Sequence, residues 1–263
     1  MAAVVWVLDL DGVVWRGDAP IAGASDAVAA LRAAGERVLF VTNNALPTRA
    51  AVEAKLSGHG IDPGDDVVTS PMAAATLVEP GERVLLCAGA GARDALEARG
   101  TRTVDASDAA AHEGSFDAVV VGLHLDFDYR RLDAAARAAR GGARLIATND
   151  DATYPGEHGL SPGAGSLLAA VQTASGVDAV VAGKPFAPMV DLVRGLAGPD
   201  GVAVGDRADT DGRFARALGY RFGLVLTGVT RPGDLPVEPA PDAVADDLAS
   251  LVEQWPGGGR SGR

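Results

Sequence analysis

Residues 4 to 13 read Val4-Val5-Trp6-Val7-Leu8-Asp9-Leu10-Asp11-Gly12-Val13. The apolar first half of this stretch is typical of a strand that is buried on both faces. Two carboxylates, Asp9 and Asp11, then follow with one residue between them. Isolated charges at the end of a buried strand are costly unless they are paired, hydrated or bound to a cation. Because ligands of open α/β sheets bind at the carboxyl ends of the strands, the stretch predicts a catalytic or metal-binding edge.

Length and composition limit the class of protein. With 263 residues, the chain can form one large domain or two modest ones. The net charge of −12 disfavours nucleic acid and anionic membranes as main partners, because both would be repelled. No run of about 18 apolar residues suits a membrane span. The apolar start turns acidic at Asp9, unlike a signal peptide, so we expect a cytoplasmic protein.

Two residue types are rare enough to be informative. The single cysteine, Cys87, lies in a strand-like run, so we expect an inert buried thiol. Of the 23 basic residues only Lys55 and Lys184 are lysines. Because the chain uses arginine at almost every other basic position, we expect a specific reason for lysine at these two positions.

Strand-like runs alternate with alanine-rich segments of helical length along the whole chain. This rhythm predicts a doubly wound parallel sheet with right-handed crossovers. A second alternating series predicts a separate, smaller α/β unit. The expected helices are 25–34, 47–59, 92–99, 129–140, 166–175, 186–196, 209–218 and 242–254, and the expected strands are 4–8, 37–41, 83–87, 101–104, 118–121, 144–147, 179–182, 202–204 and 220–226.

Polar residues follow three further strands. Thr42-Asn43-Asn44 follows the second strand, Gly183-Lys184-Pro185 follows the strand at 179–182, and Gly205-Asp206 begins an acidic loop that ends at Asp211. If all four strands are parallel neighbours, these groups converge on one edge of the sheet.

The converging groups suit phosphoryl chemistry. Carboxylates hold Mg²⁺, which prefers oxygen ligands. A lysine and short polar donors suit a phosphoryl group, whose transfer depends on positioning and on neutralising charge. One carboxylate can be the nucleophile and form an aspartyl-phosphate. A second carboxylate two residues later can protonate the leaving oxygen and then activate water.

The four motifs, in this order, resemble those of the haloacid dehalogenase superfamily of phosphatases. Three finer features resemble the branch with a C2-type cap, which includes p-nitrophenylphosphatase-like enzymes acting on pyridoxal phosphate, phosphoglycolate, glycerol phosphate or nucleotides. These features are Trp15-Arg16-Gly17, Ala147-Thr148-Asn149 with Pro162-Gly163-Ala164-Gly165-Ser166, and the separate insert between the second and third motifs.

The resemblance implies a role for each position. Asp9 would be the nucleophile and a Mg²⁺ ligand, and Asp11 the general acid and base, ligating through its backbone carbonyl. Asp206 would complete the metal site, and Asp211 would support the ligands without binding the metal itself. Substrate contacts would come from Thr42, Asn43, Asn44, Tyr154 and Lys184. Asn149-Asp150-Asp151 departs from the commoner Asn-Pro-Asp of the branch. The resemblance therefore does not determine the pocket for the leaving group.

The predicted organisation is a Rossmann-like core made of 1–71 and 183–252, an inserted α/β cap of 72–182, and a disordered tail of 253–263. The predicted function is Mg²⁺-dependent hydrolysis of a small phosphorylated metabolite, such as a sugar or glycerol phosphate, phosphoglycolate, pyridoxal phosphate or a nucleotide. The resemblance also implies a possible homodimer through the cap.

Other interpretations of these motifs remain open. Asp9 and Asp11 could begin a calcium loop, although Val14 and Pro20 stand where that loop needs glycine and glutamate. Asp11-Gly12 could form a hairpin turn. Gly89-Ala90-Gly91 imitates the start of a dinucleotide fingerprint without its third glycine. The last pattern favours the alternative function, a nucleotide- or phosphate-binding protein without hydrolase activity.

Overall fold

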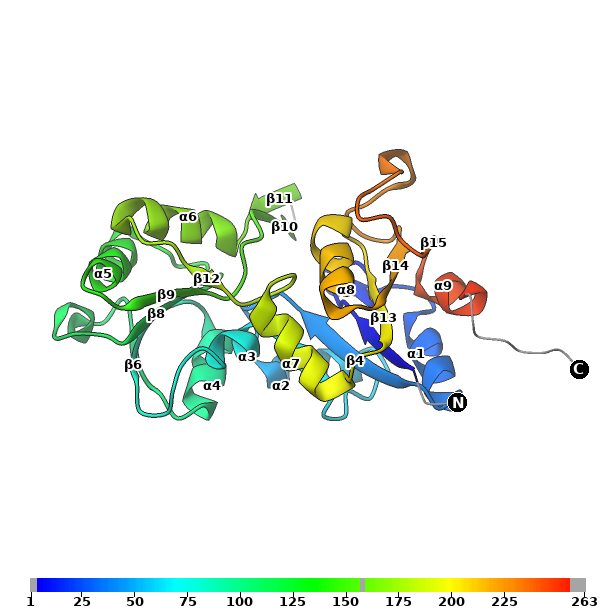
Figure 1. Cartoon of the computed structure of the whole chain (residues 1–263), viewed down its shortest axis with the longest axis horizontal. Helices are drawn as coiled ribbons and strands as arrows, with labels where there is room; N and C mark the ends of the chain where they lie inside the picture. The colour runs from blue at the N-terminus through cyan, green and yellow to red at the C-terminus, as the bar shows by residue number, and fades with distance from the viewer. Residues whose placement is uncertain (1–3, 157–158, 256–263) are drawn as a thin grey trace, which may run out of the picture. The chain divides into compact units, whose positions relative to one another are not determined.

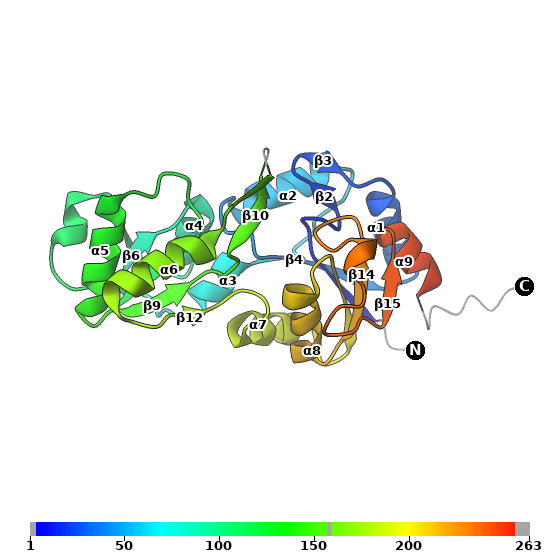
Figure 2. The same ribbon diagram turned by 90° about the horizontal axis from the view of Figure 1, so that it is seen from above.

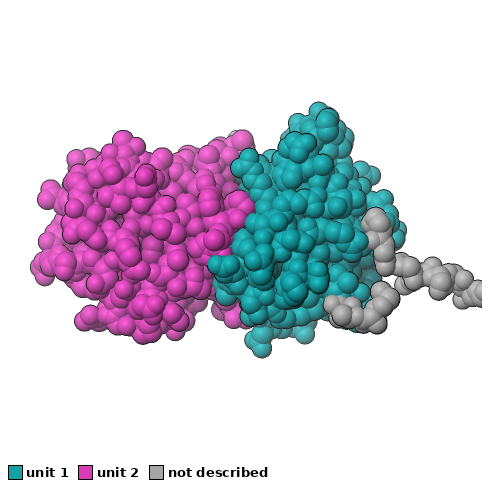
Figure 3. Space-filling view, in the orientation of Figure 1, with its two compact units in different colours: residues 1–42, 53–67, 190–263 teal, residues 43–52, 68–189 magenta. Residues whose placement is uncertain are grey.

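The computed structural model describes residues 4–156 and 159–255. The chain divides into two compact units (Figure 3): Met1–Thr42, Glu53–Val67 and Val190–Arg263 form the first, and Asn43–Val52 and Val68–Met189 form the second. Residues 43–52, 68–71 and 183–189 thus group with the second unit, whereas the sequence assigns them to the core. The functional division into core and cap remains a prediction.

A six-stranded sheet organises the first unit, in the order β15-β14-β13-β1-β4-β5. The strand β1 (Val5–Leu8) lies between β13 (Gly201–Gly205) and β4 (Arg37–Thr42), parallel to both. Next come β14 (Arg221–Val225) and β15 (Ala243–Ala245), and β5 (Val67–Thr69) is at the other edge. All four residues of β1 are buried, as its apolar sequence predicts. The doubly wound parallel sheet is confirmed.

Helices cover both faces of this sheet (Figure 1). The helices α1 (Ala24–Ala33) and α9 (Leu248–Gln254) lie on one side of β13 and β14, and α8 (Arg213–Leu218) lies on the other. Trp255, directly after α9, is buried, with its ring centroid 5.2 Å from that of Trp6. The expected tail therefore does not begin at 253; its remaining residues, 256–263, lie outside the described part of the chain.

Two short elements of this unit differ from the expectation. Residues 243–245 form β15 rather than the start of a helix. The Asp242 carboxylate accepts bonds from Phe222 N (2.7 Å) and from Arg216 Nη1 (2.8 Å), which fixes this segment beside β14. The second element is a hairpin of β2 (Trp15–Arg16) and β3 (Ala19–Pro20). Its turn therefore falls after Arg16, and not at Asp11-Gly12.

The second unit contains a parallel five-stranded sheet in the order β12-β9-β8-β6-β7. Figure 1 shows α5 and α6 on one face and α3 and α4 on the other. The hairpin β10–β11 was not expected from the sequence; Figure 2 shows it clearly. The strands are β6 (Arg83–Cys87), β7 (Arg102–Asp105), β8 (Ala118–Val121), β9 (Arg144–Ala147), β10 (Thr153–Gly156), β11 (Gly159–Pro162) and β12 (Val180–Val181). The helices are α3 (Ser70–Ala75), α4 (Ala90–Ala98), α5 (Tyr129–Arg140) and α6 (Ala164–Ser175).

Two helices contribute residues to both units: α2 (Arg49–Gly58) and α7 (Ala187–Ala197). In the part of the chain that the structure describes, every helix is too short or too polar to cross a membrane.

The thiol of Cys87 should be inert in the folded protein. The residue is buried at the end of β6, and burial raises the pKa of this thiol to about 12. Only the thiolate reacts readily with alkylating agents. We expect iodoacetamide at pH 8 to leave Cys87 unmodified in the native protein and to modify it fully in guanidinium chloride, as measured by mass spectrometry. Rapid modification of the native protein would contradict this environment.

Candidate active site

Three neighbouring strands bring polar residues to one edge of the six-stranded sheet. Asp9 follows β1, Thr42 ends β4, and Asp206 follows β13. Because the register pairs Leu8 with both Phe40 and Val204, these strands end at similar heights. The amide of Asp9 donates to Val204 O at 2.9 Å, which continues the ladder to the first acidic residue.

The carboxylates of Asp9, Asp206 and Asp211 form one cluster. Each offers an oxygen atom, and these atoms all lie within 4.8 Å of one another. Asp206 and Asp211 are buried, and Asp9 is half-buried. Three carboxylates this close repel one another strongly unless a cation lies between them. The oxygen donors and the charge of this cluster therefore fit Mg²⁺.

Asp211 belongs to this cluster through an unusual turn. Residues Ala208–Gly212 form a π-helical turn before α8, which the sequence did not predict. Asp211 N donates to Arg207 O at 2.8 Å, and Arg207 N donates to Asp211 Oδ2 at 3.2 Å. This turn directs the Asp211 carboxylate back toward the end of β13. Asp211 is predicted to support the metal ligands from outside. Its carboxylate nevertheless offers an oxygen within 4.8 Å of those of Asp9 and Asp206, as a direct ligand would.

Missing side chains make room for the acids. A Cβ atom at Gly12 would lie 2.6 Å from Asp206 Oδ2, and one at Gly205 would lie 2.2 Å from Asp211 Cβ. Gly228 also contacts Asp206, where a Cβ atom would lie 1.8 Å from Oδ2. Next to it, Val229 N donates to Asp206 Oδ2. Sequence reasoning missed Gly228 and Val229, because the tripeptide Thr227-Gly228-Val229 looks like an ordinary turn.

Asp11 is directed differently from the three clustered acids. Its Oδ1 atom accepts a hydrogen bond of 2.9 Å from Trp15 Nε1. Asp11 thus has a hydrogen-bond partner outside the carboxylate cluster, and its role as general acid and base remains a prediction. The predicted metal contact of Asp11 through its backbone carbonyl remains a prediction.

Lys184 and Asn43 both belong to the second unit, where they are joined. Lys184 N donates to Asn43 Oδ1 at 2.8 Å, and Asn43 Nδ2 donates to Lys184 O at 3.1 Å. A Cβ atom at Gly183 would lie 2.6 Å from the same Asn43 oxygen, so glycine is required there. Asn43 thus fixes the backbone of Lys184, a buried lysine. The contact of Asn43 with phosphoryl oxygens remains a prediction.

The expectation that four parallel neighbours converge is wrong for the strand before Lys184. Val180–Val181 form β12, which pairs with β9 in the five-stranded sheet. The apolar run 179–182 is consistent with either sheet, because local pattern does not specify the pairing partner. Of the four strands expected to converge, β1, β4 and β13 are neighbours in the six-stranded sheet.

The remaining predicted substrate residues lie in the second unit. Asn44 is exposed, and its Oδ1 accepts from Leu46 N at 3.1 Å, as in a local turn. Tyr154 lies on the hairpin strand β10, paired with Ser161. In the unusual Asn149-Asp150-Asp151 segment, Asp151 Oδ2 accepts from Asn43 Nδ2 at 3.0 Å. This segment therefore contacts the residue that holds Lys184.

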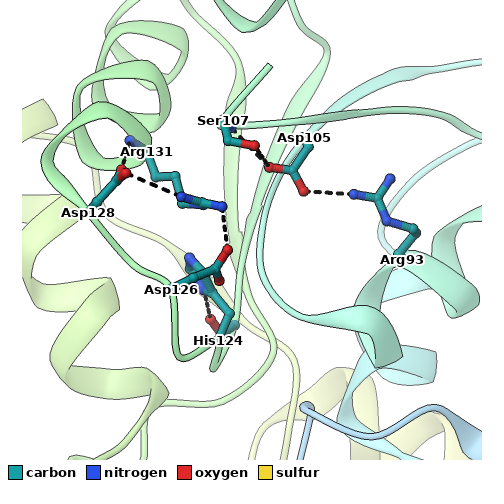
Figure 4. Close-up of polar contacts among 8 residues, drawn as sticks. Arg93, Asp105, Ser107, His124, Asp126, Asp128 and Arg131 are labelled. Carbon is teal, nitrogen blue, oxygen red and sulfur yellow. Dashed lines mark hydrogen bonds and ion pairs between the residues drawn. The ribbon is translucent and has the colours of Figure 1, made fainter.

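The glycine pattern Gly89-Ala90-Gly91 has a packing explanation. A Cβ atom at Gly91 would lie 2.2 Å from Pro47 O, and one at Gly89 would lie 3.0 Å from Leu123 O. The arginines beside this loop are already paired with carboxylates (Figure 4): Arg93 with Asp105 at 2.7 Å, and Arg131 with Asp126 and Asp128. Burial alone would raise the pKa of Asp105, but hydrogen bonds from Ser107 and the charge of Arg93 lower it overall. The loop thus supports the fold without needing a dinucleotide.

The fold and the acidic cluster define a class of enzyme that handles phosphoryl groups with a divalent metal ion. Comparison with known families agrees: residues 6–102 match the haloacid dehalogenase-like hydrolases, and residues 181–251 match a HAD-hydrolase-like family. The D-glycerol 3-phosphate phosphatase of Mycobacterium tuberculosis is 41% identical over 93% of this chain and 70% of its own. The sugar-phosphatase AraL of Bacillus subtilis is 32% identical over 94% of this chain and 93% of its own.

Solved structures show the same fold. The glycerol phosphate phosphatase of Mycobacterium tuberculosis, crystallised in complex with magnesium, superposes with a TM-score of 0.85 at 39% identity, covering 95% of this chain and 76% of that one. The chain therefore belongs to the haloacid dehalogenase-like hydrolases. It is a phosphatase of the branch that the sequence resembles, and the three clustered carboxylates fit the predicted Mg²⁺ cofactor.

The space at Gly12 should be essential for metal binding. Alanine at position 12 would press on Asp206 and would also have to adopt a φ of +87°, a left-handed conformation that costs about 1–2 kcal/mol. We expect Gly12→Ala to weaken Mg²⁺ binding about tenfold or more, a typical loss when the support of a ligand is disturbed. Isothermal titration with Mg²⁺ measures this affinity.

Gly35→Ala is the matched control, because Gly35 has a φ of +82° and open space around its missing side chain. It carries the same backbone strain without pressing on a ligand. Equal Mg²⁺ affinities of the two variants would show that contact with Asp206 is unimportant.

Proposed function

We propose that this phosphatase hydrolyses a small phosphomonoester through an aspartyl-phosphate on Asp9. The observation that carries the proposal is the carboxylate cluster of Asp9, Asp206 and Asp211 at the carboxyl ends of β1 and β13. Bound there by these acids, Mg²⁺ would neutralise the phosphoryl oxygens as the negatively charged nucleophile approaches.

In this mechanism an oxygen of Asp9 attacks phosphorus while the bond to the leaving oxygen breaks. Asp11 gives its proton to that oxygen, then takes a proton from the water that hydrolyses the aspartyl-phosphate. The hydroxyl of Thr42 would donate to a phosphoryl oxygen, and the ammonium group of Lys184 would neutralise its charge. Asn43 would hold Lys184 in place.

Glycerol phosphate is the first candidate substrate. The M. tuberculosis relative, 41% identical, is named for D-glycerol 3-phosphate, and the B. subtilis relative is named a sugar-phosphatase. Phosphoglycolate, pyridoxal phosphate and nucleotides are further candidates from the resemblance. The roles of Asn44 and Tyr154 in contacting the leaving group, a cytoplasmic location and a homodimer through the cap belong to this proposal as predictions.

The proposal is tested by phosphate release from purified protein with these phosphomonoesters, with Mg²⁺ and with excess chelator. We expect the protein to release phosphate with Mg²⁺ and to release none with chelator. The rate of phosphate release by Asp9→Asn should fall to that of a protein-free control. Asp26→Asn changes an exposed acid in the first turn of α1 and should leave the rate unchanged. Full activity of Asp9→Asn would exclude Asp9 as the nucleophile.

A further inference from the structure

Lys55, the other of the two lysines, has no role in the proposed mechanism but makes specific contacts in the first unit. Its ammonium nitrogen lies 4.5 Å from the ring centroid of Trp15 and donates to Gly17 O at 2.6 Å. Asp18 lies 3.6 Å away, but its side chain is fully exposed, so this ion pair contributes little. The lysine is thus held chiefly by an aromatic face and a carbonyl oxygen.

Trp15 connects this lysine to the acidic edge. The indole is only 3% exposed and packs against the ring of His59, whose centroid lies 5.9 Å away. The indole N–H donates to Asp11 Oδ1 at 2.9 Å. The backbone reinforces this contact, because Gly12 N donates to Trp15 O at 2.7 Å. Trp15 therefore has Lys55 and His59 against its ring and Asp11 at its polar end.

We infer that Lys55 is a positioning residue that acts through Trp15 on Asp11; the inference rests on the acid role proposed for Asp11. A cation over a buried indole favours one ring orientation, because the attraction depends on the geometry of the ring face. That orientation fixes the direction of the indole N–H and, with it, the rotamer of Asp11. Without Lys55, the carboxyl group would sample orientations that do not reach the leaving oxygen.

The contact also distinguishes the two carboxyl oxygens of Asp11. An indole N–H can only donate, so Oδ1 acts as the acceptor. In the proposed mechanism, Oδ2 would be the oxygen that carries the acid proton. As Asp9 forms its bond to phosphorus and the bond to the leaving oxygen breaks, this proton moves from Oδ2 to the leaving oxygen.

The geometry explains why lysine occupies this position. An ammonium group is a compact charge on a flexible stem, so it can contact the centre of a ring and a nearby carbonyl oxygen together. A guanidinium group is planar and wider and spreads its charge over a fork. Arginine at position 55 would preserve the charge over the ring but would place its donors differently.

A leaving-group comparison distinguishes this role from a purely structural one. Glycerol 3-phosphate releases a strongly basic alkoxide that needs a proton, whereas p-nitrophenyl phosphate releases a stable phenolate that does not. The value of kcat/KM reports the steps up to the first irreversible one, which is transfer to Asp9. Misplacing Asp11 should therefore lower kcat/KM for glycerol 3-phosphate selectively, whereas damage to the fold or metal site would lower both values.

The test uses Lys55→Met, which removes the charge, and Trp15→Phe, which keeps a ring but removes the N–H donor. General acid catalysis typically contributes 10²–10⁴-fold. We expect each variant to lose about tenfold or more of kcat/KM with glycerol 3-phosphate, a part of that contribution, and less than about threefold with p-nitrophenyl phosphate. Lys55→Arg should lie closer to the wild type than to Lys55→Met.

Arg32→Met is the matched control. Arg32 also lies over an aromatic ring, that of Phe40 at 5.9 Å, and donates to a backbone carbonyl, Asp62 O at 2.7 Å. Its loss should leave the ratio of the two kcat/KM values unchanged. Circular dichroism and thermal unfolding establish that each variant is folded.

Asp11→Asn separates the two possible failures. If Asp11→Asn lowers kcat/KM equally for glycerol 3-phosphate and for p-nitrophenyl phosphate, the acid role proposed for Asp11 is wrong. If Asp11→Asn is selective but folded Lys55→Met and Trp15→Phe are not, the positioning role of Lys55 is wrong and the proposed mechanism stands.

Discussion

The repulsion among three neighbouring carboxylates is the constraint on which this structure depends. Two unit charges 4 Å apart repel by about 4 kcal/mol at an effective dielectric constant of 20. Asp9, Asp206 and Asp211 have oxygens within 4.8 Å of one another, and two of these residues are buried. Such a cluster is stable in a folded protein when the surrounding backbone donates to it and a divalent cation completes it.

The fold brings the three acids together and supplies the backbone donors. Parallel strands end at one edge, so β1 and β13 bring acids together that are far apart in sequence. Val229 N donates to Asp206, and the π-helical turn before α8 returns the Asp211 carboxylate to the same point. Asp11 instead accepts a hydrogen bond from the indole of Trp15, and the proposed mechanism gives this acid the proton transfer. Asp9 and Asp11, two acids of one motif, thus have different neighbours.

The sequence predicts what depends on local pattern. Strands 83–87, 118–121 and 144–147 and helix 129–140 have the expected bounds, because their apolar periodicity is regular. The acids at the strand ends were also recognisable. Strand pairing was not: β12 joins the second sheet, although its apolar run suits either. The support from Gly228 and the contact of Lys55 with Trp15 depend on tertiary proximity, which no spacing in the chain reveals.

The central claim is that Asp9 carries the phosphoryl group during turnover. Acid quenching within milliseconds of mixing the Mg²⁺-loaded enzyme with glycerol 3-phosphate, followed by peptide mapping with mass spectrometry, tests it directly. The account predicts an acid-stable, base-labile phosphoryl group on the peptide that contains Asp9. Phosphate release with no phosphoryl group on that peptide at any quench time, or with one on another residue, would contradict it.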